Sequence, residues 1–411
     1  MNQSSSRNLQ QKKIHWKKKR KTNPKAKIRI ATMFSGIGAI EHAFQRLKLK
    51  HEIVFACDND WAVKESYLAN YDIDPKRFYD SVDASCLCAK KYKYKVDLLV
   101  GGSPCQSFSM VGKRKGLEDT RGTLFYDFAR VISECKPKIF IFENVKGLLS
   151  HDNGNTWNTI MGVFNELGYH IKLSDKKDCV LNSKHFGVPQ NRSRIFIIGF
   201  RKKKWINDFA YPDPIELESK MQDYLEDFTE SKYFLKEKGV KFVTSLKNQK
   251  KSFTQINGSI ALCQKANQQF NWHGDFIFEE SLKKLKFDEQ LFKINKVETK
   301  YFLSDKVEKY VRKKGTKNFK TRTETDLEVA RPLLQSMHKM HRAGVDNYVT
   351  HSGKIRKLTP RECLRLMGFR DNFKIVVSDT QAYRQAGNSI VVDVLMAILK
   401  QIDITQYGKL N

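Results

Sequence analysis

The chain has 411 residues, 40% of them hydrophobic and 29% charged, which suits a globular protein of two or three domains. Its formal net charge of +30 indicates a polyanionic partner, most simply a nucleic acid, although lysine also serves as a plain solubilising residue. No apolar run approaches the length of a membrane span, and no apolar segment of a secretory signal follows the basic N-terminus.

The eight cysteines do not form a recognisable framework. None belongs to a Cys-x-x-Cys pair, and no histidine flanks them at the spacing of metal ligands. The sequence therefore predicts neither a zinc site nor a set of disulfides, and we expect no bound metal. This use of cysteine fits a reducing compartment.

The first half of the chain predicts an α/β fold. Residues 1–27 are polar and basic, and we expect a disordered arm able to contact phosphates. Over residues 28–202, apolar strand-like runs alternate with stretches of helical periodicity. Strands are expected at 28–34, 52–56, 97–100, 138–142 and 194–200, the last in a hairpin with 178–181, and helices at 40–47, 63–68, 124–135 and 157–167. This alternation predicts a mostly parallel sheet with helices on both faces.

The pattern changes after residue 202. Residues 203–350 are rich in Lys, Phe, Asn and Gln and lack a clear strand–helix repeat, which predicts a separate, smaller and irregular domain. Residues 351–411 are expected to return to the first domain. There, Pro360 opens a helix that Gly368 ends, and a Gly387-Asn388 loop leads into an apolar helix.

Residues suited to ligand binding or catalysis follow several of the predicted strands. They are Phe34-Ser35-Gly36-Ile37-Gly38, Asp58, Pro104-Cys105 and Glu143-Asn144. Parallel strands end at one shared edge of the sheet, and ligands bind beyond that edge. Because unrelated loop residues would be scattered over both edges, the sequence predicts a functional site at this one.

The loop after the first strand predicts a nucleoside-binding site. Gly36 and Gly38 let the backbone approach a ligand closely, but Glu41 replaces the third glycine of a dinucleotide fingerprint, which favours a ligand without pyrophosphate. Asp58 is placed to accept hydrogen bonds from ribose hydroxyls, and Asp83 to meet an adenine amino group. Taken singly, each aspartate is equally consistent with a turn or a helix cap.

Cys105 stands on a rigid support, because two glycines and a proline precede it at the end of a strand. A lone loop cysteine is more often structural than nucleophilic. Glu143 ends the neighbouring strand, and burial there would raise its pKa and keep it a proton donor. A thiolate beside a carboxylic acid suits addition to an electron-poor ring.

Two further stretches suit contact with a polyanion. Arg192 and Arg194 fall on one face of an extended segment, where their guanidinium groups would hold a phosphate and polarise a base carbonyl, or simply form a basic edge strand. Residues 107–122 form a polar, basic loop with three glycines, which predicts either a lid that closes over the site or a mobile surface loop.

Together, these motifs resemble those of the DNA (cytosine-5)-methyltransferases, and they occur in that family's order. The resemblance is carried by Phe34-Ser35-Gly36-Ile37-Gly38, Pro104-Cys105-Gln106, Arg121-Gly122-Thr123-Leu124-Phe125, Glu143-Asn144-Val145, Gln190-x-Arg192-x-Arg194, Arg361-Glu362 with Met367-Gly368-Phe369, and Gly387-Asn388-Ser389-Ile390. It implies a Rossmann-like S-adenosylmethionine-dependent methyltransferase domain, with residues 203–350 as a target-recognition domain. One position departs from the family, because Asn59, with Trp61 two residues on, stands where an aromatic residue often stacks on adenine.

The resemblance also implies roles for single residues. Cys105 would add to C6 of a cytosine flipped out of double-stranded DNA, and Glu143 would engage N3, so that C5 takes a methyl group from S-adenosylmethionine. Arg192 and Arg194 would complete the catalytic set. The residues expected to bind the cofactor are Phe34, Ser35, Gly36, Ile37, Gly38, Asp58, Asn59, Asp83, Ala84, Gly102, Pro104, Leu124, Asn388, Ser389 and Ile390.

A compact chain without regulatory domains suggests a monomeric bacterial modification enzyme, cytoplasmic and bound to nucleoid DNA, which is functionally paired with a restriction endonuclease. A tRNA cytosine-5 methyltransferase of the same fold is an alternative, but the Cys-Phe-Thr tripeptide of that subfamily is absent. An inactive DNA-binding member would be expected to lack Cys105 or Glu143, and both are present. A nicotinamide oxidoreductase is disfavoured by Glu41 and the incomplete glycine fingerprint.

Overall fold

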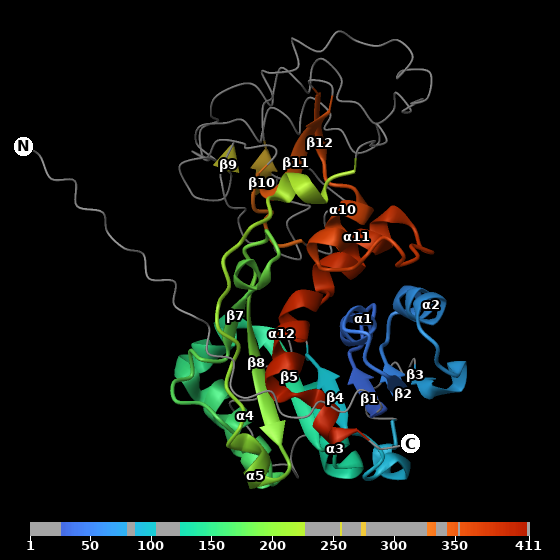
Figure 1. Cartoon of the computed structure of the whole chain (residues 1–411), viewed down its shortest axis with the longest axis vertical. Helices are drawn as coiled ribbons and strands as arrows, with labels where there is room; N and C mark the ends of the chain where they lie inside the picture. The colour runs from blue at the N-terminus through green and yellow to red at the C-terminus, as the bar shows by residue number, and fades with distance from the viewer. Residues whose placement is uncertain are drawn as a thin grey trace, which may run out of the picture.

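The structure, a computed structural model, describes residues 26–79, 87–103, 124–226, 327–333 and 358–408, and the backbone of 255–256, 273–276, 343–351 and 354–357. Within these residues, a larger sheet has the strand order β3-β2-β1-β4-β5-β8-β6, and β7 also pairs with β8 (Figure 1). Its strands are β1 (Ile28–Met33), β2 (His51–Cys57), β3 (Phe78–Tyr79), β4 (Leu98–Gly101), β5 (Ile139–Val145), β6 (His170–Ile171), β7 (Val180–Asn182) and β8 (Ser193–Phe200).

The larger sheet is mostly parallel, as predicted. Strands β3, β2, β1, β4 and β5 all run in one direction, whereas β8 runs antiparallel to β5. The chain passes from β1 outward to β2 and β3, then returns to place β4 on the other side of β1. The gap between the ends of β1 and β4 is therefore the point where the strand order reverses, and it is there that ligands bind in sheets of this kind.

The strands are apolar on both faces because helices cover both faces. In β5, Ile139 and Ile141 pack into one core, and Phe140 and Phe142 into the other. The other central strands alternate in the same way, with β4 sending Leu99 to the second core. Because both faces are buried, these strands read in the sequence as short continuous apolar runs, which is how they were predicted.

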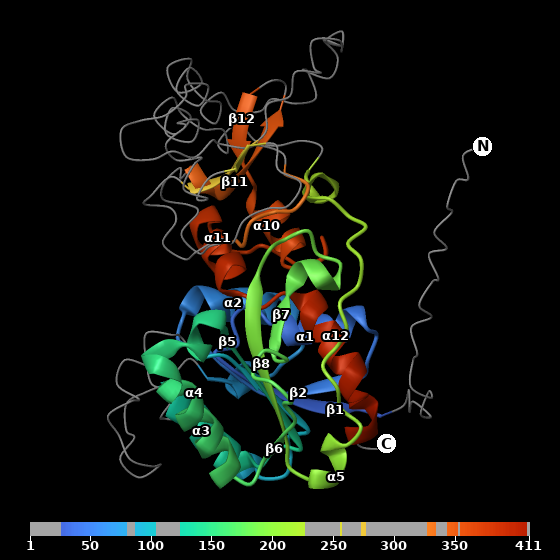
Figure 2. The same cartoon turned by 90° about the vertical axis from the view of Figure 1, so that its left-hand side faces the viewer.

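Helices form the outer layers (Figure 2). Helices α1 (Ala39–Arg46), α2 (Trp61–Asn70) and α12 (Val392–Ile402) pack on one face, and α3 (Leu124–Cys135) and α4 (Asn155–Glu166) on the other. Shorter helices are α5 (Lys203–Ile206), α10 (Pro360–Leu366) and α11 (Asp379–Asn388), and 3-10 turns are η1 (Pro75–Arg77), η3 (Ala89–Tyr92), η5 (Lys146–Leu149), η6 (His151–Gly154), η7 (Ser183–Phe186), η8 (Met221–Tyr224) and η13 (Ile404–Tyr407). None of the helices described is both long and apolar enough to cross a membrane.

Most predicted helices are confirmed, and one predicted loop is wrong. Pro360 opens α10, with Thr359 and Glu362 forming a reciprocal capping box. Gly387 and Asn388, however, are the last two residues of helix α11 rather than a loop. The buried residues Ala382, Tyr383 and Ala386 of α11 recur at helical spacing, and this apolar stripe outweighs the turn preference of a Gly-Asn pair.

A second sheet lies beyond α10 and α11 (Figure 1), with strand order β12-β11-β10-β9. Its strands are β9 (Gln255–Ile256), β10 (His273–Phe276), β11 (Ala343–His351) and β12 (Lys354–Lys357). The chain therefore leaves this sheet only after β12, later than the predicted return at residue 351. Phe209, Met221 and Leu333, all inside the region 203–350, pack in the core of the larger sheet.

Candidate active site

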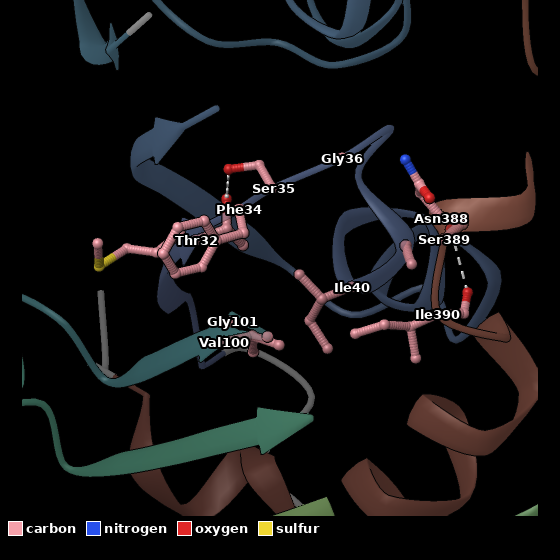
Figure 3. A pocket seen from close by; sticks show the side chains of 13 residues that line it. Thr32, Phe34, Ser35, Gly36, Ile40, Val100, Gly101, Asn388, Ser389 and Ile390 are labelled. Atoms are coloured by element: carbon pink, nitrogen blue, oxygen red, sulfur yellow. Dashed lines mark hydrogen bonds between the residues drawn. The ribbon is translucent and has the colours of Figure 1, made fainter. Parts of the chain in front are cut away.

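An open pocket lies at the point where β1 and β4 end (Figure 3). It is lined by Thr32, Met33, Phe34, Ser35, Gly36, Ala39, Ile40, Val100, Gly101, Gly102, Asn388, Ser389 and Ile390. Figure 3 shows Asn388, Ser389 and Ile390 along one side and Phe34 on the other. Three segments far apart in sequence thus supply one site, and the predicted lining residues among them are Phe34, Ser35, Gly36, Gly102, Asn388, Ser389 and Ile390.

The loop after β1 is held in a left-handed backbone conformation. Phe34, Gly36 and Gly38 have φ angles of 52°, 51° and 78°, which a residue with a side chain adopts only at a cost. The Gly36 amide donates to Asp58 Oδ2 at 2.9 Å, and the other oxygen of this carboxylate accepts from the Asp60 amide at 3.1 Å. Asp58 thus orients the loop and lies beside it, as its position after β2 predicts.

Tyr71, directly after α2, supports the same loop through its hydroxyl group and its ring. Its hydroxyl lies 3.0 Å from the Ile37 carbonyl oxygen and 2.8 Å from that of Gly38, and it is the donor to both. A Cβ on Gly38 would lie 2.2 Å from the Tyr71 ring. Gly38 is therefore needed for two reasons, its positive φ and the close approach of an aromatic ring.

Glu41 is enclosed in the interior rather than directed at the glycine loop. The Tyr67 hydroxyl donates to Glu41 Oε1 at 2.6 Å, and neither side chain is accessible to solvent. Burial raises the pKa of Glu41 to about 7, because ionisation would place a charge in an apolar interior. The carboxyl group predicted to repel a pyrophosphate instead joins α1 to α2.

Glu143 and Arg194 form an ion pair at the end of β5. The antiparallel register of β5 and β8 sets Glu143 opposite Phe196 and Arg194 opposite Val145, so the two side chains are diagonal neighbours on one face. Arg194 Nε lies 3.2 Å from Glu143 Oε1. Burial raises the pKa of Glu143, while the charges of Arg194 and Arg192 act to lower it. The net result is a carboxyl group that holds its proton more readily than an ordinary glutamate.

The end of β4 is fastened beside this pair. Asn144 donates from Nδ2 to the Ser103 carbonyl at 2.9 Å, which places the segment leading to residue 104 against the end of β5. Cys105 and Pro104 lie outside the described residues, as do Asp83, Ala84, most of the arm 1–27 and the predicted lid 107–122. Their predicted roles remain predictions.

The structure corrects the predicted placement of Arg192. Its side chain is 4% exposed, and its guanidinium donates to the backbone oxygens of Leu333, Gly387 and Ser389. A guanidinium buried among backbone carbonyls is not presented to a phosphate. Arg194, two residues later, is the member of this pair that reaches Glu143.

The other predicted cofactor residues do not line the pocket. Ile37 and Gly38 are buried in the loop, Asn59 is exposed, and Leu124 is the half-buried first residue of α3. Trp61, the first residue of α2, is 63% exposed. Across the described part of the chain, no three or more His, Cys, Asp or Glu side chains gather as they would around a metal ion.

Sequence reasoning missed several residues of the site. Pocket-lining residues that were not predicted are Thr32, Met33, Ala39, Ile40, Val100 and Gly101. These residues could have been predicted, because each lies at the end of a predicted strand or in the first turn of the following helix. Tyr71 carried no comparable signal, since its partners are backbone carbonyls far away in sequence.

Comparison with known proteins identifies relatives over the whole described core. Residues 28–403 match the family model described as C-5 cytosine-specific DNA methylase. Type II methyltransferase M.HpaII of Haemophilus parainfluenzae is 32% identical over 92% of this chain and 90% of its own length. Type II methyltransferase M.HhaI of Haemophilus parahaemolyticus is 30% identical, covering 91% of this chain and 94% of its own.

Two further comparisons concern a phage protein and a solved structure. Orphan methyltransferase M.SPRI of Bacillus phage SPR is 31% identical over 93% of this chain and 99% of its own length. Among solved structures, a Spodoptera frugiperda DNMT2 mutant matches with a TM-score of 0.61, covering 91% of this chain and 99% of that one. At 19% sequence identity, this last similarity shows a common fold.

Proposed function

Since the chain belongs to the C-5 cytosine-specific DNA methylase family, we propose that it methylates C5 of a cytosine flipped out of a specific double-stranded DNA sequence, through a covalent bond between Cys105 and C6. The observation that carries this proposal is the position of Glu143. It stands at the end of β5 with a raised pKa, paired with Arg194 and next to the segment that leads to Cys105.

We propose that S-adenosylmethionine binds in the pocket at the ends of β1 and β4, and the residues there support this. Asp58 is oriented by the Gly36 amide and keeps lone pairs for ribose hydroxyls, while Gly101 and Gly102 leave one wall without side chains. The exposed Asn388 amide can hydrogen-bond the amino-acid end of the ligand. When bound, this cofactor supplies the methyl group that the cytosine receives.

The proposed catalysis uses two groups of this chain. The Cys105 thiolate forms a bond to C6, the electrons of the C5–C6 double bond become available at C5, and the Glu143 proton is shared with N3. After C5 has gained its methyl group, a solvent water accepts the C5 proton and the electrons of that C–H bond restore the C5–C6 double bond. The C6–sulfur bond breaks with its electron pair returning to the Cys105 thiolate, and the proton shared with N3 returns to Glu143. Arg194 holds one oxygen of Glu143, so the other is available for N3.

A base inside a duplex does not expose C5 and C6 to two such groups, so the cytosine must leave the stack, at a cost of roughly a few kcal/mol. We propose that the second sheet, β9 to β12, belongs to a target-recognition domain that begins within residues 203–350 and continues through β12 to Lys357. Contacts of lysine and arginine with phosphates would offset the cost of flipping, and the net charge of +30 supports strong, salt-dependent binding.

The bacterial relatives named as type II methyltransferases support a restriction-modification role, in which this enzyme protects DNA from a paired endonuclease. Such an enzyme would work as a monomer in the bacterial cytoplasm, on nucleoid DNA. The relative named as an orphan methyltransferase supplies the contrasting outcome, methylation without a paired endonuclease. A host extract that cuts the unmethylated but not the methylated form of the same DNA sequence would support the paired role, and an extract that cuts neither form would support the orphan role.

Bisulfite sequencing of DNA from a host that expresses the protein tests the proposed activity. We expect new 5-methylcytosine at one short sequence, and none with Cys105→Ser. Cys88→Ser is the matched control, because Cys88 is exposed and lies outside the pocket. Normal methylation by Cys105→Ser would show that Cys105 is not the nucleophile, and a lack of any new 5-methylcytosine with the wild-type protein would exclude the proposed function.

A further inference from the structure

Arg192 joins three parts of the chain that are far apart in sequence. Its Nη1 donates to the Leu333 carbonyl at 3.1 Å, and its Nη2 donates to the Gly387 and Ser389 carbonyls, each at 3.0 Å. Leu333 belongs to the described segment 327–333, whereas Gly387 and Ser389 lie at the end of α11. One buried cation therefore satisfies carbonyl groups from two separate segments.

Gln190, two residues before Arg192 in the segment that leads into β8, contacts the backbone amide of Leu333. Its Oε1 accepts from the Leu333 amide at 3.0 Å, and its Nε2 donates to the Leu366 carbonyl at 2.8 Å. Gln190 has no solvent exposure. Leu333 is thus fixed through both its N–H and its C=O, and the same two side chains also reach the ends of α10 and α11.

Ser389 is the link between this network and the pocket. It lines the pocket together with its neighbours Asn388 and Ile390. Arg192 directly precedes β8 (Ser193–Phe200), the strand whose Arg194 is paired with Glu143. The hydrogen bonds of Arg192 therefore tie one wall of the pocket to the strand that carries the partner of the catalytic acid.

We propose that Arg192 is a positioning residue, which sets the Asn388–Ile390 wall of the cofactor pocket in the free protein and does not act through contact with DNA. This inference rests on the proposed function, in which that pocket binds S-adenosylmethionine. A guanidinium is required because its planar fork donates to several carbonyls at once, whereas the single ammonium of lysine cannot span both segments.

The test compares Arg192→Lys with Arg365→Lys by calorimetric titration with S-adenosylhomocysteine in the absence of DNA. A positioning role predicts that Arg192→Lys raises the Kd at least about 10-fold, since two or more buried hydrogen bonds behind the pocket wall are lost. Arg365→Lys, whose guanidinium also donates to backbone carbonyls but at Tyr224 and Leu225 and outside the pocket, is expected to bind within about 2-fold of wild type. A residue that contacts a phosphate or a base would weaken binding or turnover only with DNA present.

An unchanged Kd in folded Arg192→Lys, with loss confined to DNA binding or turnover, overturns the proposal. A second measurement needs no variant. Hydrogen–deuterium exchange of the wild-type protein should show protection of residues 327–333 when S-adenosylhomocysteine binds, although none of them lines the pocket. Equal exchange there with and without S-adenosylhomocysteine also overturns it. Wild-type protein that does not bind S-adenosylhomocysteine contradicts the proposed function and, with it, this inference.

Discussion

Gly102 lies so close to Glu143 that a Cβ on it would be 2.7 Å from Glu143 Oε2 and 2.8 Å from the Glu143 backbone oxygen. The parallel register of β4 and β5 pairs Gly101 with Phe142, which brings the next residue of each strand together. The carboxyl oxygen can rotate away, but the backbone oxygen cannot. The absence of a side chain at position 102 therefore decides where the Glu143 carboxyl group sits.

Gly102→Ala is expected to displace the end of β5 or of β4 and to lower the methylation rate at least about 10-fold, with a loss of about 1–3 kcal/mol in the free energy of unfolding from overpacking. Single-turnover methylation and urea unfolding measure the two effects. The matched control is Gly162→Ala in α4, where the added Cβ would meet nothing within 4 Å. This change should leave the rate unaltered and stabilise the helix by about 0.4–1 kcal/mol. An equal loss of rate in both variants would contradict the steric argument.

Tyr71→Phe tests the support of the cofactor loop. The ring against Gly38 stays, but the Ile37 and Gly38 carbonyls lose their hydroxyl donor. We expect a loss of about 1–3 kcal/mol in unfolding free energy and a weaker affinity for S-adenosylhomocysteine. Tyr169→Phe is the control, because its buried hydroxyl donates to the Pro137 carbonyl near the opposite end of β5. The control should lose similar stability while binding the ligand normally, and equal binding by both variants would contradict a role for Tyr71.

The raised pKa of Glu41 predicts that the free energy of unfolding depends on pH. The folded protein keeps the Glu41 proton up to a pKa of about 7, whereas the unfolded chain loses it near the ordinary value of 4.5. Between these values the folded state binds more protons, so its stability falls as the pH rises through this window. The shift of about 2.5 pKa units corresponds to about 3 kcal/mol at pH above 7.

Glu41→Gln isolates this effect, because the glutamine oxygen still accepts the Tyr67 hydroxyl but carries no ionisable proton. Its unfolding free energy, measured in urea, should exceed that of wild type by a margin that grows from pH 4.5 to pH 7 and is constant above. Other titrating groups cancel in the difference. If the margin is the same at pH 5 and pH 8, burial does not raise the pKa of Glu41.

Arg194 should control the protonation of Glu143. Burial raises the pKa of Glu143, and the Arg194 charge 3.2 Å away lowers it. Removing this charge with Arg194→Gln is expected to raise the pKa further, so that Glu143 stays protonated to a higher pH. In single-turnover methylation, the alkaline fall in rate that depends on Glu143 should move to higher pH. Glu143→Gln identifies that limb by removing it, and an identical limb in wild type and Arg194→Gln would refute the coupling.

Local patterns account for what was predicted correctly. The strand residues Ile139 to Phe142 alternate between two cores, and the helix Leu124–Cys135 shows its apolar stripe within twelve residues. Helix α11 was not predicted, and its last two residues were taken for a loop, because a Gly-Asn pair has the composition of a turn while the packing of Tyr383 and Ala386 extends the helix through it. Such patterns depend only on residues that are neighbours in sequence, so they can be recognised without the structure.

Local patterns along the chain were enough to predict most strands and helices of the larger sheet, the glycine loop and the placement of Asp58 and Glu143 at one edge, because parallel strands end at a shared edge whatever their packing. The tertiary structure was needed to show that the Arg192 guanidinium is turned inward and that Gly102 lies against Glu143. The hydrogen-bond partners of Arg192 are 141 to 197 residues away, at Leu333, Gly387 and Ser389. Contacts over such separations arise from how whole layers pack, and no local pattern encodes them.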